Sequence, residues 1–214
     1  MNSDFKIAVI DYGMGNVRSI KNALLHIGDF QIDVTSDQYI ISSADCIILP
    51  GVGAYPDAMK NLRDRNLIDL LNIQVLDKKK PLLGICLGMQ LLFTSSAEGG
   101  RNNGLGWIPG TVEYMELNDG FRIPHMGWND LHLRQPSSMF DALEEDKNFY
   151  FVHSYHAVCS DEYVIASFEY GKEFTAAIQY ENIVGMQFHP EKSQQNGLNA
   201  LKQFIKWAGD LSDA

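Results

Sequence analysis

The strongest constraint on the fold of this chain is the alternation, in its first half, of short apolar runs with a segment of helical periodicity. Four apolar runs predict strands: KIAVI at 6–10, QIDVT at 31–35, DCIIL at 45–49 and PLLGI at 81–85. Between the first two, apolar residues recur at helical spacing at Val17, Ile20, Ala23, Leu24 and Ile27. This alternation is typical of parallel strands joined by crossover helices. The almost wholly apolar PLLGI is predicted to be a central strand covered on both faces.

From about Thr111 onward the pattern changes to alternating runs rich in β-branched and aromatic residues, which favour successive antiparallel strands. These runs are TVEYMEL, NFYFVH, YVIASFEYG, EFTAAIQY and IVGMQFH. Helices are expected from about Leu87 to Ser95 and from about Gln195 to Ala208. We therefore predict a single α/β domain over residues 1–214, with a mostly parallel central sheet flanked by helices and an antiparallel β extension.

Composition and charge exclude several classes of protein. The 214 residues are 45% hydrophobic, enough to bury a substantial core, and the net charge of −10 disfavours nucleic acid and anionic membranes as partners. No segment approaches the roughly 18 consecutive apolar residues of a membrane span, and the start lacks a basic region followed by a long apolar run, so a cytoplasmic location is expected. The three cysteines, Cys46, Cys86 and Cys159, form no CxxC pair and predict neither a disulfide framework nor a metal site.

Cys86 stands between two glycines in GICLG, immediately after a predicted strand and before a predicted helix. The pattern G-x-C-x-G resembles a nucleophile elbow, a sharp turn in which Gly84 and Gly88 relieve steric crowding around a strained central residue. The following helix N-terminus favours thiolate over thiol, and the amide of Leu87 would face an oxyanion above the sulfur. The alternative is that Cys86 only fills space in a buried strand.

A base for such a nucleophile is offered by QFHPEKS at 187–193. In an extended segment, His189 and Glu191 project to the same side, and Pro190 favours the extended conformation. A carboxylate beside an imidazole fixes its tautomer and stabilises the imidazolium. The alternative is an ordinary surface turn, and metal ligation is less favoured because a third ligand with suitable spacing is lacking.

Three motifs in this order resemble the class I (triad) glutamine amidotransferases: PGVG at 50–53, GICLGMQLLF at 84–93 and GMQFHPEKS at 185–193. The similarity extends over nearly the whole chain. Three further segments resemble the glutaminase subunits of imidazole glycerol phosphate synthase, the bacterial enzyme that makes the imidazole ring in histidine biosynthesis: IDYGMGNVRSI at 10–20, PHMGWN at 124–129 and YFVHSYHAV at 150–158.

The resemblance implies roles for individual residues in the hydrolysis of L-glutamine without a cofactor. Cys86 is implied as nucleophile, His189 as acid and base, and Glu191 as the group that orients the imidazole. The oxyanion is assigned to backbone amides of Gly51 or Val52 and of Leu87. The residues implied to bind the glutamine substrate are Gly53, Gln90, Glu98, Ser154 and Tyr155.

The resemblance also implies a heteromeric cyclase or synthase subunit as partner, which binds the ammonia acceptor and receives ammonia through a closed channel. The residues expected at this interface and channel are Asp11, Asn16, Arg18, His125, Trp128 and Lys192. Trp128 is alternatively a packing residue. GMGNVR at 13–18 follows the first strand as a nucleotide-binding loop does, but Arg18 stands where the third glycine of that motif belongs.

Three other functions are alternatives to a glutaminase subunit of the histidine pathway. A paralogous glutaminase subunit could supply ammonia to a sugar amidotransferase of surface polysaccharide biosynthesis. A cysteine peptidase or esterase could use a similar elbow, although Gln90, Glu98 and PGVG count against it. An inactive regulatory homologue would have lost a triad member, and all three are present. Cys46 and Cys159 are expected to be core thiols.

Overall fold

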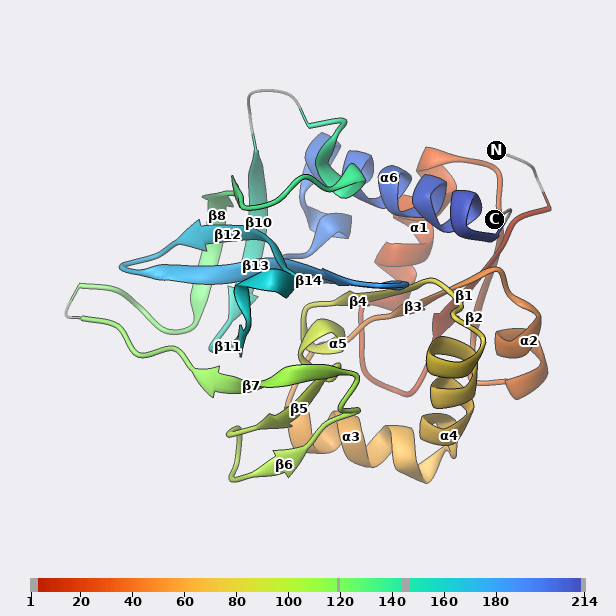
Figure 1. Cartoon of the computed structure of the whole chain (residues 1–214), viewed down its shortest axis with the longest axis horizontal. Helices are drawn as coiled ribbons and strands as arrows, with labels where there is room; N and C mark the ends of the chain where they lie inside the picture. The colour runs from red at the N-terminus through yellow and green to blue at the C-terminus, as the bar shows by residue number, and fades with distance from the viewer. Residues whose placement is uncertain (1–3, 119, 144–146, 213–214) are drawn as a thin grey trace.

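A computed structural model of the chain describes residues 4–118, 120–143 and 147–212 (Figure 1). The strands are β1 Lys6–Ile10, β2 Gln31–Thr35, β3 Cys46–Leu49, β4 Leu82–Ile85, β5 Phe93–Ser96, β6 Asn102–Asn103, β7 Ile108–Tyr114, β8 His125–Asp130, β9 His132–Leu133, β10 Asn148–His153, β11 Tyr155–Cys159, β12 Val164–Glu169, β13 Glu173–Tyr180 and β14 Ile183–Met186. The α-helices are α1 Val17–Ile27, α2 Gln38–Ser43, α3 Tyr55–Asp64, α4 Leu67–Asn72, α5 Leu87–Gln90 and α6 Gln194–Ser212. Shorter helical turns are η1 Ile73–Asp77, η2 Ser138–Phe140, η3 Asp161–Tyr163 and η4 Pro190–Lys192.

The central sheet has the strand order β2-β1-β3-β4-β14-β13-β12-β9 among the described residues. The strands from β2 to β14 are parallel, and β13, β12 and β9 continue the sheet in antiparallel fashion. One row of apolar residues crosses the parallel part in register: Val34, Val9, Ile48, Leu83 and Val184. The predicted fold class, a mostly parallel sheet with an antiparallel extension, is confirmed.

Helices cover both faces of the parallel strands, which explains why these strands are apolar at successive positions rather than at alternate ones. Val9 and Ile48 belong to a core cluster that includes residues of α1 and α6. The alternate residues, such as Ile10 and Ile47, belong to a second cluster with residues of α2, α3 and α4. Figure 1 shows α1 and α6 on one side of the sheet and α3 and α4 on the other. None of the helices in these described segments has the length and apolar character needed to cross a membrane.

The helix expected from Leu87 to Ser95 is wrong beyond its first turn, because α5 ends at Gln90 and β5 begins at Phe93. The returning segment 105–108 takes the carbonyls that a longer helix would need: Leu105 N–H bonds to Leu91 C=O, and Trp107 N–H bonds to Leu92 C=O. The run of apolar side chains at 91–93 is entirely buried. Tertiary pairing therefore outweighs local helical preference here.

The antiparallel strands of the second half divide among three sheets rather than forming one. β12 and β13 extend the central sheet, β10 pairs with β8, and β11 pairs with β7 in a smaller sheet of order β11-β7-β5-β6. This arrangement brings the β8–β10 ribbon and the start of β11 to the carboxyl ends of the parallel strands. In open α/β sheets, that edge is where ligands bind.

Candidate active site

Cys86 occupies the turn between β4 and α5 and has the backbone angles φ 53° and ψ −112°. A positive φ is uncommon for a residue other than glycine and marks local strain, which recurs at functional sites. The side chain is nearly buried, at 6% exposure. The backbone N–H of Cys86 bonds to Met186 C=O at 2.7 Å and ties the turn to β14. The predicted elbow is thus present in the backbone geometry.

The two flanking glycines are required by close packing around this turn. A Cβ on Gly88 would lie 1.9 Å from the carbonyl oxygen of Leu49, at the end of β3. A Cβ on Gly84 would lie 2.9 Å from the carbonyl oxygen of Gly88 itself. Neither contact leaves room for a side chain, so GICLG carries glycine where β3, β4 and α5 meet.

His189 and Glu191 form a buried pair at the carboxyl end of β14. His189 Nδ1 lies 2.9 Å from Glu191 Oε1, and the two side chains are 2% and 0% exposed. Because the carboxylate accepts, Nδ1 carries the donated proton and Nε2 is directed elsewhere. Nε2 is buried, and within the described segments it has no hydrogen-bond partner. The backbone holds the ring in place, since His189 N–H bonds to Tyr150 C=O and Ser193 Oγ bonds to His189 C=O.

The electrostatic environment of His189 favours the imidazolium. Burial alone lowers the pKa of this imidazole, but the neighbouring Cys86 and Glu191 outweigh it and raise the pKa to about 9. Two groups that carry negative charge when ionised therefore stabilise the cation. At neutral pH the site therefore holds a protonated imidazole beside Cys86.

The segment PGVG lies across from this turn, between β3 and α3. A Cβ on Gly51 would lie 2.7 Å from the backbone nitrogen of Gly88 and 2.8 Å from Leu87 Cβ, so only glycine fits there. Within the described part of the chain, the amides of Gly51 and Val52 donate no hydrogen bond. Leu87 is the first residue of α5, where helical N–H groups lack intrahelical partners. The backbone of Gly51 therefore packs against the first turn of α5, the helix that follows Cys86.

Tyr12 was not identified from the sequence as part of the site. It follows β1, is fully buried, and its hydroxyl donates to Pro50 C=O at 2.7 Å. Burial raises the pKa of Tyr12, with a smaller contribution from Cys86, so the phenol remains a neutral donor. This hydrogen bond holds Pro50, the first residue of the PGVG segment, in place.

A cavity of about 330 Å³ opens above Cys86 and His189. This volume is at the small end of ligand pockets. The walls include most of the residues expected to bind glutamine or hold the oxyanion, together with three that were not expected, Pro124, Val152 and His153. The predicted residues in its lining are Val52, Gly53, Cys86, Leu87, Gln90, Glu98, Ser154, Tyr155 and His189. Gly51 and Glu191 lie behind this lining.

Two polar side chains of the cavity are held by hydrogen bonds. Gln90 Nε2 donates to Tyr155 C=O at 2.9 Å and to Gln187 Oε1 at 3.0 Å. Glu98 Oε2 accepts from the backbone N–H of Tyr55, at the start of α3, at 3.0 Å. Burial raises the pKa of Glu98, and the bond from Tyr55 opposes that rise. Both residues are therefore anchored before any ligand arrives.

His125, expected at the partner interface or channel, is buried at 2% exposure. Successive residues of β8 alternate between its two faces, so His125 points inward while Met126 and Trp128 point outward. His125 Nδ1 lies 3.4 Å from His153 Nε2, and His153 Nδ1 lies 2.9 Å from Tyr155 C=O. Burial lowers the pKa of His125 to about 4 and that of His153 to about 3, so both rings are neutral.

The outer face of the β8–β10 ribbon is exposed and apolar. Trp128 lies opposite Tyr150 in register, with ring centroids 5.9 Å apart, and Met126 lies opposite Val152 in the cavity wall. Trp128 is 45% exposed and Met126 is 64% exposed. The Lys192 ammonium lies 5.7 Å from the centroid of the Tyr150 ring. This face leads from the cavity towards η4.

The remaining expected interface residues lie near the start of α1, which packs against η4. Asp11 and Arg18 are exposed, and Asn16 is half-buried and makes no side-chain cap bond. Asp11 Oδ1 accepts from Gly13 N–H at 3.1 Å. With Trp128 and Lys192, these residues lie at the carboxyl edge of the sheet.

The other two cysteines lie outside the cavity. Cys46 is fully buried in β3, and burial raises the pKa of its thiol. Cys159 is partly buried at the end of β11, where burial raises its pKa to about 11. Cys46 is a core thiol as expected, and Cys159 is packed against the second core cluster. A search of the described residues finds no group of three or more His, Cys, Asp or Glu arranged for a metal ion.

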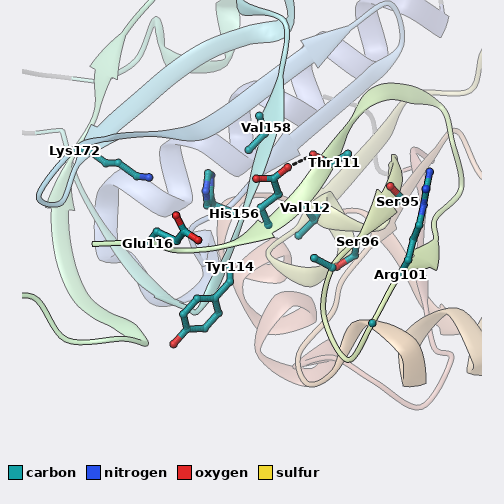
Figure 2. Close-up of a pocket in the computed structure, with 13 residues that line it drawn as sticks. Ser95, Ser96, Arg101, Thr111, Val112, Tyr114, Glu116, His156, Val158 and Lys172 are labelled. Carbon is teal, nitrogen blue, oxygen red and sulfur yellow. Dashed lines mark hydrogen bonds between the residues drawn. The ribbon is translucent and has the colours of Figure 1, made fainter. Parts of the chain in front are cut away.

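A larger cleft, of about 700 Å³, lies on the sheet formed by β11, β7, β5 and β6 (Figure 2). Figure 2 shows Arg101 and Lys172 at opposite ends of this cleft, with His156 and Glu116 between them. Tyr114 in its wall makes an edge contact with Tyr155 of the smaller cavity, with ring centroids 5.4 Å apart. Since none of the predicted site residues lines it, size alone does not mark the active site.

Comparison with known proteins agrees with this geometry. A family model described as Glutamine amidotransferase class-I matches residues 8–207. The chain belongs to the class I glutamine amidotransferase family. The resemblance inferred from the sequence motifs is confirmed.

Individual members of this family match over almost their full length. The chain is 61% identical over 202 residues to imidazole glycerol phosphate synthase subunit HisH 2 of Vibrio vulnificus (strain YJ016), covering 94% of each. It is 46% identical over 208 residues to imidazole glycerol phosphate synthase subunit HisH of Aquifex aeolicus (strain VF5), covering 97% of this chain and 99% of that one. A solved structure of PurLQS from Thermotoga maritima aligns with TM-score 0.72 and 21% identity, covering 95% of this chain and 99% of that chain. At that identity, the likeness establishes the fold alone.

Proposed function

We propose that this chain is the glutaminase subunit of an imidazole glycerol phosphate synthase in histidine biosynthesis. In this function it hydrolyses L-glutamine to glutamate and ammonia, and a cyclase subunit receives the ammonia. The observation that carries the proposal is the strained, nearly buried Cys86 sharing one cavity with His189, whose other ring nitrogen bonds to Glu191. The family and the relatives named above support the choice of glutamine as substrate and of this pathway.

In the first half-reaction, the Cys86 thiolate attacks the side-chain carboxamide carbon of glutamine. A carbon–sulfur bond forms, and the carbonyl electron pair moves onto oxygen. The amides of Leu87 and of Gly51 or Val52 are the donors available to hold this oxyanion. The His189 imidazolium gives its Nε2 proton to the departing nitrogen. The oxyanion pair then re-forms the carbonyl as the carbon–nitrogen bond breaks, so that ammonia departs and a thioester remains on Cys86.

In the second half-reaction, water hydrolyses the thioester. Neutral His189 takes a proton from water as the oxygen attacks the thioester carbon, and the carbon–sulfur bond then breaks. The carbonyl re-forms as the thiolate leaves, which restores the starting thiolate–imidazolium pair, and the new carboxyl group releases its proton to solvent to give glutamate. Throughout, Glu191 keeps the proton of Nδ1 in place, so that Nε2 is the nitrogen that exchanges protons.

Substrate binding falls to the polar lining of the same cavity. The Glu98 carboxylate suits the ammonium of the glutamine α-carbon, and Gln90 keeps Oε1 for a ligand because its amide nitrogen already serves two acceptors within the protein. Gly53, Ser154 and Tyr155 complete the wall around the amino-acid end. A cavity of this size suits free glutamine better than a peptide, which disfavours the peptidase and esterase alternatives.

Ammonia must reach the acceptor without mixing with solvent, where protonation would remove its nucleophilicity. The exposed apolar face of Met126 and Trp128, which adjoins the cavity wall, suits a seal against the partner subunit. We expect Asp11, Asn16, Arg18 and Lys192 to fix the register of that contact through polar bonds. We also expect the isolated chain to be a poor glutaminase, because one misdirected oxyanion amide lowers the rate by roughly 100- to 1,000-fold.

The proposal is tested by combining the chain with the cyclase subunit from the same genome and measuring glutamate and aminated product. The wild-type pair should use glutamine, and the pair containing Cys86→Ala should make product only from added ammonium salt. Product formation with a nucleotide-sugar amidating enzyme instead of the cyclase would favour the polysaccharide alternative. Glutamine-dependent turnover that survives in Cys86→Ala would refute the glutaminase assignment.

Ammonia transfer is tested separately with Trp128→Ala. This change should leave glutamate release by the complex within a few-fold of wild type while lowering the ratio of aminated product to glutamate. Tyr39→Ala is the control, because Tyr39 is an aromatic residue of α2 that is 81% exposed. A product-to-glutamate ratio that stays near one in Trp128→Ala means that the ring is only a packing residue.

A further inference from the structure

Gln187 is a fully buried residue that the sequence motifs do not assign to the reaction, and the sheet places it beside Cys86. The parallel strands β4 and β14 pair with Ile85 opposite Met186. The next residue of each strand is therefore Cys86 on one and Gln187 on the other. The bond from Cys86 N–H to Met186 C=O, at 2.7 Å, fixes this register at the point where the side chains meet.

The side chain of Gln187 joins the sulfur to the glutamine-binding wall. Its Nε2 donates to Cys86 Sγ at 3.8 Å, and its Oε1 accepts from Gln90 Nε2 at 3.0 Å. Gln187 is 0% exposed, so water does not compete for these bonds. A hydrogen bond to a thiolate is charge-assisted and favours the ionised form.

The orientation of the Gln187 amide follows from its neighbours rather than from an arbitrary choice of O and N. The carbonyl of Tyr155 can only accept, so the Gln90 atom that faces it, at 2.9 Å, must be the amide nitrogen. That same nitrogen also donates to Gln187, so the Gln187 atom that accepts this hydrogen bond must be its amide oxygen. The Gln187 NH₂ group is then left facing the sulfur of Cys86.

We propose that Gln187 is a positioning residue of the glutaminase reaction, which donates its side-chain N–H to the Cys86 thiolate and links that sulfur to Gln90. The inference deepens the proposed function and rests on it, because it takes Cys86 as the nucleophile. Gln187 has no ionisable group, so its donated bond persists across the whole pH range of activity. His189 exchanges protons, and Gln187 holds the sulfur in position.

The Nε2 and Oε1 atoms of Gln187 have different partners, so substitutions that remove one or both of these atoms should affect kcat and KM differently. Gln187→Glu retains an oxygen for Gln90 but replaces the N–H that faces the sulfur by a second oxygen. It should lower kcat and thiolate formation while leaving the KM for glutamine within a few-fold. Gln187→Met removes both bonds in a side chain of similar length, so it should lower thiolate formation and also raise KM.

The test is the pH profile of Cys86 alkylation by iodoacetamide, a small neutral reagent, measured on the full chain alone and with its partner. Peptide mass mapping assigns label to each cysteine. In Gln187→Met the rate of Cys86 alkylation at neutral pH should fall by about tenfold, because one charge-assisted hydrogen bond is lost, and it should fall further in Gln187→Glu. Gln74→Met is the matched control, because Gln74 is 2% exposed and bonds to Ser42, away from the cavity.

An alkylation profile for Gln187→Met and Gln187→Glu that coincides with those of wild type and Gln74→Met overturns the proposal. If the thermal midpoint shows that Gln187→Met does not fold, the alkylation profile of Gln187→Glu alone tests the role of Gln187, because this substitution preserves the side-chain volume. The glutaminase assignment fails by a different result, namely glutamine turnover in Cys86→Ala. Loss of activity in Cys86→Ala together with unchanged alkylation in the Gln187 variants would reject only the role of Gln187.

Discussion

Cys46 and Cys86 belong to neighbouring parallel strands, and their different surroundings show what makes a buried thiol chemically useful. Their exposures are only 0% and 6%. Cys46 is the first residue of β3, whereas Cys86 follows the last residue of β4. The two cysteines therefore lie at opposite ends of the neighbouring parallel strands, Cys46 at the amino ends and Cys86 at the carboxyl ends. Burial raises the pKa of Cys46 and favours an inert thiol. Cys86 has the N-terminus of α5, a protonated His189 and the amide of Gln187 around it.

The difference teaches that burial by itself does not decide reactivity. Both thiols are removed from water, but only at the carboxyl edge of the parallel strands do backbone N–H groups and polar loop residues converge. The positive φ at Cys86 adds a local distortion that Cys46, in a regular strand, does not have.

Removing the sulfur at the reactive position should have the largest effect. Cys86→Ala should lower glutamine hydrolysis by about 10⁴-fold or more, because the covalent route is lost. The measurement is glutamate release by the complex with its partner. Cys46→Ala should stay within a factor of a few of wild type, and a comparable loss in both variants would mean that the two thiols do not differ as described.

Crowding the reactive turn should be the next most damaging change. Gly88→Ala places a Cβ 1.9 Å from Leu49 C=O, so β3 and α5 must separate. We expect a loss of roughly 3 kcal/mol in the free energy of unfolding, in the upper range for overpacked cores. Denaturant titration measures it. In the control Gly209→Ala, the nearest atom is 3.9 Å from the new Cβ, and stability should not fall.

Weakening the support of the imidazole should have an intermediate effect. Glu191→Gln removes a charge-assisted bond, for which about 1.5–3 kcal/mol, or roughly 10- to 100-fold in turnover, is expected. Glu191 raises the pKa of His189, so this variant should lose activity at lower pH on the alkaline side than wild type. The measurement is the pH profile of glutamate release.

The same variant tests the sign of the pH dependence of stability. Because the pKa of His189 rises from 6.5 to about 9 on folding, its ion pairing contributes fully below pH 6.5 and is lost as pH rises through about 9. Glu191→Gln should flatten that decline in thermal stability. Glu181→Gln is the control, because Glu181 forms an exposed pair with Lys79. An alkaline limb unmoved in Glu191→Gln would contradict the assigned pairing.

The smallest effect is expected at the inert thiol. Cys46→Ala leaves a small cavity in β3 and should reduce the free energy of unfolding by about 1 kcal/mol without changing the alkylation of Cys86. Thermal or denaturant unfolding of the two proteins provides the comparison. Faster iodoacetamide labelling at Cys46 than at Cys86 in the wild-type chain would reverse the contrast between the two positions.

Much of the site follows from local sequence because its parts are short and contiguous. GICLG predicts the strained turn from two glycines at fixed spacing. His189 and Glu191 are only two positions apart in HPE, so their pairing can also be predicted from local sequence. The family resemblance adds PGVG and the glutamine-binding residues. Six of these line one cavity together with Cys86, Leu87 and His189. The inward orientation of His125 was missed, although the alternation of a strand through PHMGWN would have indicated it.

Sequence patterns were enough to predict the central strands, the helix at 17–27 and the candidate nucleophile and base, Cys86 and His189. Each of these predictions depends on neighbouring residues and on apolar periodicity. Only the tertiary structure decided where α5 ends, because the 105–108 segment takes up carbonyls of the 91–93 run. It also decided that Gln187 lies beside Cys86, 101 residues away in the chain, because that contact depends on the parallel register of β4 and β14. Register between distant strands is set by packing and hydrogen bonding of the whole sheet, which no local pattern contains.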